Sequence, residues 1–212
     1  MHAFARVGLG ILVLLSAAVE ASFGVGALSR ALGFQFPYPA GWTGVAGYLL
    51  VASFVLTIVI RLGVWRLAGM RRGAVPLVLA FACALVTAAV LLVMRASTQA
   101  QMIGSQGNLV LGLNALSLLG ALLFAVGLLL SRLVPRWIGW IGVAGVAVHA
   151  PTSLYSSRAT NQLLVFAYSA NDWLRGALPV IELVFLVALG VSLILGLSAE
   201  SPTSNKRFER TA

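Results

Sequence analysis

Apolar positions run along this chain in long, unbroken stretches, which short polar segments separate. A stretch of about 20 apolar residues can cross the roughly 30 Å hydrocarbon core of a bilayer as a helix, because a helix satisfies its own backbone polar groups. Six such stretches are predicted as membrane spans, at residues 7–28, 44–65, 75–94, 109–130, 137–155 and 178–197. The predicted fold class is therefore all-α: one helical bundle over residues 1–198 with about six transmembrane helices, followed by a disordered cytoplasmic tail at 199–212.

The first span also has features of a secretory signal peptide, namely an arginine, an apolar run and the small residue Ala21. However, the apolar character continues past Ala21 to Leu28, and Glu20 is an awkward neighbour for a cleavage site. These features favour a retained span over a cleaved leader.

Composition agrees with a membrane protein, since 60% of the 212 residues are hydrophobic and 9% are charged. A soluble domain carries about a quarter charged residues. The formal charge of +9 does not indicate nucleic-acid binding, because the basic residues separate apolar runs and do not cluster with aromatics. With both termini in the cytoplasm, ten of the 14 lysines and arginines lie inside, Arg61 among them, and four lie outside. This bias predicts cytoplasmic termini.

A short sequence occurs twice in the chain. GWTGVAG at 41–47 returns as GWIGVAG at 139–145, at the start of the second and the fifth predicted spans. These two spans begin on opposite sides of the membrane, as they would in a three-plus-three repeat with inverted topology. Pro76 and Pro179, which open the third and sixth predicted spans, would also correspond. The alternative is that Gly, Ala, Val and Trp are simply common at helix ends.

Ionisable residues within the spans gather toward one side of the membrane. The alternating span directions place Glu20, His149 and Glu182 in the outer half, and Arg95 and Arg175 near the outer face. Ionisable groups inside a span usually face a bundle interior or a wet cavity. We therefore expect an outward-facing polar pocket whose binding residues are these five.

Each of these residues also has a structural interpretation. Glu182 could pair with Arg175 and fix the helix register, and His149 could donate to a neighbouring helix carbonyl. A metal site of Glu20, His149 and Glu182 lacks a binding motif, so neither a metal nor a cofactor is predicted. The single cysteine, Cys83, is interpreted as a packing residue.

Two motifs carry a resemblance to a known family. SRLVPRWIGWIGVAG at 131–145 and LPVIEL at 178–183 resemble the fourth-to-fifth helix junction and the last-helix start of domain-of-unknown-function family 4386. The resemblance implies a six-helix integral protein of a bacterial cytoplasmic membrane, with no established activity. It marks Pro135, Arg136 and Trp137 as a structural junction and also marks Glu182. Pro135 suits the start of a helix, and Arg136 and Trp137 suit the membrane interface.

The sequence supports two main functional hypotheses. The first is a small transporter-like bundle that binds a small molecule or ion, and the alternative is a non-catalytic component that binds a membrane partner or senses the envelope. No reaction motif is present, so an enzyme is the third choice. Expected partners are the lipid bilayer, a small-molecule or ion substrate, and a membrane protein or a second copy of the chain, but no nucleic acid.

Overall fold

The chain folds into long helices joined by short connections. The computed structural model describes residues 2–33, 42–69, 73–96, 106–155 and 164–198, so the predicted tail at 199–212 lies outside the described residues. Within these ranges all regular structure is helical. The helices are α1 (His2–Ala31), α2 (Trp42–Ala68), α3 (Ala74–Ala96), α4 (Gln106–Ser131), α5 (Arg136–Tyr155) and α6 (Leu164–Ile194).

Five helices are long and apolar enough to cross a membrane. Among the described residues, these candidate spans are Ala3–Val25, Val45–Ala68, Ala74–Leu91, Gly112–Ser131 and Ala177–Ile194, in α1, α2, α3, α4 and α6. The shortest helix, α5, is not one of the five. The all-helical prediction is confirmed, and the five apolar helices indicate a membrane protein.

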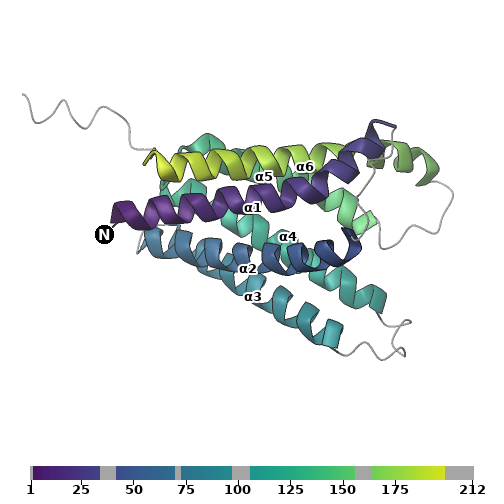
Figure 1. Ribbon diagram of the computed structural model, residues 1–212, viewed down its shortest axis with the longest axis horizontal. Coiled ribbons are helices and arrows are strands. Elements are labelled where there is room, and N and C mark those ends of the chain that lie inside the picture. The colour runs from purple at the N-terminus through teal and green to yellow at the C-terminus, as the bar shows by residue number, and fades with distance from the viewer. Residues whose placement is uncertain (1, 34–41, 70–72, 97–105, 156–163, 199–212) are drawn as a thin grey trace, which may run out of the picture.

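The six helices form a closed ring. Each helix packs against its neighbours in the chain, and α6 packs along α1, so that the last helix closes the ring on the first. In Figure 1 the helices lie side by side along the long axis, and successive helices run in opposite directions. This arrangement leaves room for side chains from all six helices to meet at the centre.

The outer faces of the helices are apolar. Exposed large hydrophobic residues recur at helical spacing, for example Val51, Val55 and Val59 on α2, and Val180, Val184, Val187 and Val191 on α6. In a soluble helix the exposed face would be polar. An apolar exterior over several helices is what a lipid environment requires.

One end of the ring is filled by a compact hydrophobic core. The buried side chains come from the first half of α1, the last turns of α2, α4 and α6, the first turns of α3 and α5, and the connection between α4 and α5. The largest are Val13, Val64, Leu77, Leu128, Val134, Ile138, Leu189 and Leu193. Arg6 adds polar contacts here, because its Nη2 donates hydrogen bonds to the carbonyls of Leu133 and Leu197, each at 3.3 Å. This end of the bundle is therefore tightly closed.

Small residues allow α1 and α6 to approach closely. A Cβ atom at Gly10 would lie 2.8 Å from the carbonyl oxygen of Gly190 and 2.6 Å from Cγ1 of Ile194. Farther along the pair, a Cβ atom at Gly24 would lie 2.7 Å from Cβ of Pro179. Close backbone approach at small residues is the usual way in which helices pack in lipid. The α1–α6 contact is the most extensive helix pair among the described residues.

The last helix differs from its sequence-based prediction. It begins at Leu164, well before the predicted start near residue 178, and Pro179 lies inside it rather than opening it. A proline inside a helix removes one backbone hydrogen bond and crowds the preceding turn. Here the proline ring packs over Gly24 of α1, which has no side chain to obstruct it.

Candidate functional site

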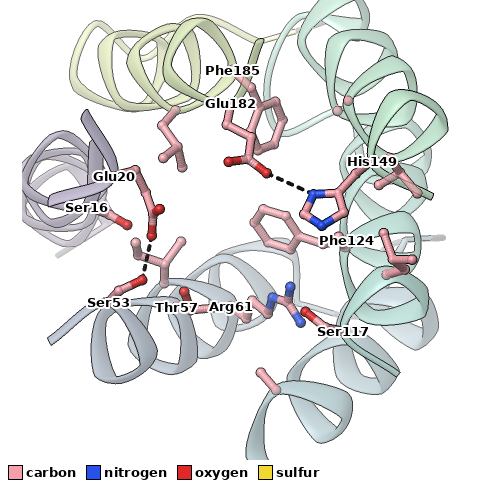
Figure 2. Close-up of a pocket in the computed structure, with 18 of the residues that line it drawn as sticks. Ser16, Glu20, Ser53, Thr57, Arg61, Ser117, Phe124, His149, Glu182 and Phe185 are labelled. Atoms are coloured by element: carbon pink, nitrogen blue, oxygen red, sulfur yellow. Dashed lines mark hydrogen bonds and ion pairs between the residues drawn. The ribbon is translucent and has the colours of Figure 1, made fainter. Parts of the chain in front are cut away.

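A cavity of about 330 Å³ lies in the centre of the ring and is lined by residues from all six helices. This volume is at the lower end of the range of about 300–1,000 Å³ typical of small-molecule sites. Most of its wall is apolar, but ionisable and hydroxyl side chains project into it, as Figure 2 shows. The hydrophobic core closes the ring beyond the level of Ile60 and Phe124, so the cavity occupies the opposite half of the bundle.

Glu20 enters the cavity from α1. Ser16 and Glu20 are four residues apart, so they lie on the same face of the helix and both line the cavity. The Ser53 hydroxyl on α2 donates a hydrogen bond to Oε1 of Glu20, at 2.5 Å. Figure 2 shows this bond spanning the gap between α1 and α2. Glu20 is partly buried, and the hydroxyl of Ser53 provides one of the polar contacts that water would otherwise supply.

His149 and Glu182 form an ion pair across the neighbouring part of the cavity. Nδ1 of His149 on α5 lies 3.4 Å from Oε1 of Glu182 on α6. The side chains are 38% and 41% exposed, so this part of the cavity is open. Glu20 lines the same cavity as this pair. Two acids and an imidazole therefore share one open region.

Arg61 lies at the deep end of the cavity. Its Nη1 donates a 2.7 Å hydrogen bond to the carbonyl oxygen of Ala80 on α3, and its guanidinium stands 5.8 Å from the ring centroid of Phe124 on α4. Guanidinium groups commonly stack on aromatic faces in this way. Among the described residues no carboxylate lies within 4 Å of the Arg61 guanidinium. The ion pair found in this part of the chain joins His149 and Glu182 and does not include Arg61.

The pattern of basic residues along the sequence places Arg61 among the cytoplasmic charges that set orientation and predicts no site role for it. The residue lies inside the predicted span 44–65. The criterion that singled out Glu20 and Glu182, an ionisable group within a span, would have found it. What the sequence could not provide was the direction of the side chain, which points to the carbonyl of Ala80 on α3.

The structure describes three of the five predicted binding residues. Glu20, His149 and Glu182 line the one cavity, whereas the side chains of Arg95 and Arg175 lie outside the described part of the structure. The described residues contain no cluster of three or more histidine, cysteine or acidic side chains placed to hold a metal ion.

The predicted junction lies at the other end of the bundle. Pro135 immediately precedes α5, and Arg136 and Trp137 are exposed in its first turn. Trp137 and His149 are twelve residues apart on α5, which corresponds to about 18 Å along the helix. The junction therefore contributes to helix placement and not to the cavity.

The polar wall opposite the acids comes from α3 and α4. It consists of Thr87, Asn114 and Ser117. The Thr87 side chain is buried, at 6% exposure, and its hydroxyl oxygen has no hydrogen-bond partner in the described structure. Buried hydroxyl groups are normally hydrogen-bonded, so this oxygen is an exception, but it is enclosed by protein atoms and has almost no surface accessible from the cavity.

Comparison of the chain with protein-family models, with curated proteins and with solved structures found no match. The resemblance to domain-of-unknown-function family 4386 therefore stays a prediction. The class defined by fold and site is an α-helical bundle with an apolar exterior and a polar central cavity, and its function is inferred from the cavity itself.

Proposed function

We propose that this protein is a small transporter-like membrane bundle that binds a proton or a small cation in its central cavity. The observation that carries the proposal is that Glu20 and Glu182 both project into one cavity lined by all six helices. Intramembrane acids are costly, and they usually mark a pathway for substrates or ions.

The neighbours of the two acids suit reversible binding. Ser53 and His149 hold the carboxylates of Glu20 and Glu182 without a full positive charge fixed beside either one. A permanent lysine or arginine partner would compete with a cationic solute for the same oxygens. A hydroxyl group competes far less because it carries no charge, and histidine, unlike lysine or arginine, is not a permanent cation. Both carboxylates therefore remain available to an incoming cation.

We further propose that α5 is a sixth span and that the protein lies in a bacterial cytoplasmic membrane with both termini inside. The ten-to-four distribution of basic residues supports this orientation. The cavity would then open outward, because the closed end of the ring holds the N-terminal half of α1 and the last turns of α6. An alkaline-phosphatase fusion at residue 100 should be active outside the cytoplasm, and a fluorescent-protein fusion at the C-terminus should fluoresce inside. The reverse pattern would contradict the orientation.

We retain the inverted repeat and the membership of domain-of-unknown-function family 4386 as proposals. The repeat is supported by six identities in seven residues, at the start of α2 and in the first turns of α5. These helices hold the second position in each set of three. The family proposal is supported by the Pro135–Arg136–Trp137 junction at the start of α5 and by Glu182.

Flux measurements in proteoliposomes test the transport proposal. Labelled choline and tetraethylammonium serve as permanently charged cations that cross lipid poorly, and trapped pyranine reports protons. The wild-type protein is expected to carry at least one of these probes. The flux of the combined Glu20→Gln and Glu182→Gln variant is expected to be at least about tenfold lower than that of the wild type. The reason is that the loss of two charge-assisted contacts costs more than about 1.4 kcal/mol.

A substitution of the same kind, Glu200→Gln, provides the matched control, because Glu200 follows the predicted membrane spans in the sequence. Circular dichroism and gel filtration would verify that each variant is folded. Equal flux in the double variant and the wild type would refute the assignment of the two acids. Cation binding without flux would instead favour the alternative role in partner binding or sensing.

A further inference from the structure

The cavity is chemically different at its two ends. Glu20 and Glu182 lie in its open region, and Arg61 lies at its deep end beside Phe124. Ser53, the partner of Glu20, and Arg61 are both on α2 and are eight residues apart. This separation corresponds to about 12 Å of helix rise, so the acidic and basic groups are offset along the length of the cavity. In Figure 2 Glu20, Glu182 and Arg61 project into the cavity from α1, α6 and α2.

The guanidinium of Arg61 has unused binding capacity. Arginine carries five N–H donors, and the hydrogen bond found for Arg61 among the described residues is the one from Nη1 to Ala80. Neither carboxylate of the cavity lies within ion-pair distance of the guanidinium in the described structure. The remaining donors form a planar fork that matches the two oxygens of a carboxylate or phosphate.

The surroundings of Arg61 keep the guanidinium in this position. A Cβ atom at Gly120 on α4 would lie 2.7 Å from Nη1, so the absence of a side chain there leaves room for the guanidinium. One turn farther toward the open end, the Ser117 side chain lines the cavity. This part of the cavity therefore offers one cation and one hydroxyl group to a ligand.

From this arrangement we infer that the cavity binds an elongated zwitterion, with its cationic group at Glu20 and Glu182 and its oxyanion at Arg61. The inference rests on the proposed binding of cations by the two acids and adds the chemistry of the second end of the ligand. A ligand without net charge satisfies both ends of the cavity together, whereas a simple cation leaves the fork of Arg61 unoccupied.

A plain structural role for Arg61 is the competing explanation. Its bond to Ala80 and its contact with Phe124 connect α2 to α3 and α4, and that connection alone could account for an arginine at this depth. The two explanations differ in one measurable respect. A structural arginine does not discriminate between ligands that have and lack an oxyanion.

Matched ligands test the inference on the wild-type protein in lipid nanodiscs. The zwitterions are β-alanine, γ-aminobutyrate, 5-aminopentanoate and 6-aminohexanoate, and each is compared by calorimetric titration with the amine that lacks its carboxylate, from ethylamine to pentylamine. The longer zwitterions are expected to bind about 10- to 100-fold more tightly than their amines, the effect of a hydrogen-bonded charge pair. The shortest zwitterion is expected to gain little, because it cannot reach both ends.

Substitution of Arg61 provides the second arm. Arg61→Gln is expected to reduce zwitterion affinity to that of the matched amine and to leave amine affinity unchanged. Arg66→Gln, on the exposed face of the same helix, is the matched control and should change neither. If Arg61→Gln does not fold, Arg61→Lys is the test variant. It keeps the charge but loses the fork, and it should reduce the advantage of the zwitterion only in part.

The outcomes separate this inference from the proposed function. If amines bind the wild-type protein and every zwitterion binds no better than its amine, the oxyanion site is refuted and the proposed cation binding stands. An unchanged zwitterion advantage in folded Arg61→Gln also refutes the assignment of Arg61. If neither amines nor zwitterions bind, the proposed cation site fails together with this inference.

Discussion

The guanidinium of Arg61 on α2 packs directly against the backbone of Gly120 on α4. A Cβ atom at position 120 would lie 2.7 Å from Nη1 of Arg61 and 2.9 Å from Cβ of Cys83 on α3. The guanidinium therefore occupies space that any other residue at position 120 would fill. Cys83 belongs to the same packed contact, which is consistent with its interpretation as a packing residue.

This relationship predicts that Gly120→Ala displaces Arg61. Because the added methyl group meets both a side chain and the α3 surface, we expect a loss of about 1–3 kcal/mol in the free energy of unfolding, as is typical of overpacking. Unfolding in mixed detergent micelles measures the loss. Gly112→Ala on the same helix is the control, since a Cβ atom there meets nothing within 4 Å. Equal stability of the two variants would contradict the close fit at Gly120.

The contact between α1 and α6 predicts that alanine substitution at two nearby glycines has very different effects on the free energy of unfolding. Gly10→Ala places a methyl group against the backbone of Gly190 and against Ile194, so the helices must separate, at a cost of about 1–3 kcal/mol. Gly8→Ala, two residues earlier, meets nothing within 4 Å. Chemical unfolding of both variants provides the measurement. A Gly10→Ala protein as stable as Gly8→Ala would contradict the close approach of the two helices.

The sequence predicted much of the arrangement because hydropathy and helix rise are local properties. Apolar runs located the helices, and alternating directions at 1.5 Å per residue predicted Glu20, His149 and Glu182 in the same half of the bundle. The structure brings these three side chains to one cavity. The position of each residue along its helix could be counted from the sequence. The common direction of the three side chains depends on how the helices pack into a ring.

Arg61 and Pro179 show where local reasoning fails. The direction of the Arg61 side chain depends on a carbonyl of α3, on an aromatic ring of α4 and on the absence of a side chain at Gly120, none of which is near it in the sequence. Pro179 indicated a helix start, because proline breaks the backbone hydrogen-bond pattern. The helix nevertheless continues through it, and Gly24 of α1 leaves space for the ring.

The closed and open ends of the bundle predict different accessibility to reagents. In a Cys83→Ala background, Ser117→Cys on the cavity wall should react with a membrane-impermeant methanethiosulfonate added outside intact cells. Ala68→Cys, buried at 2% exposure in the core, should react at least about tenfold more slowly. Rates are read from the gel shift of a maleimide-polymer added afterwards.

Inverted vesicles provide the orientation control for this experiment. If the cavity opens outward, Ser117→Cys should be protected when the reagent has access to the cytoplasmic face alone. Rapid reaction from that face and none from outside would show that the cavity opens inward. Equal rates at the two positions from both faces would contradict the closed core.

The contact between α1 and α6 also has a consequence for biosynthesis. Of the six helices, α1 leaves the ribosome before the other five and α6 after them, so the contact that closes the ring joins the two helices that are farthest apart in this series. Contacts of such high sequence separation form late and slowly. Until translation of α6 is complete, Glu20 has no enclosed site to face, and the nascent protein must keep that acid in the bilayer or at its surface without the partners that later surround it.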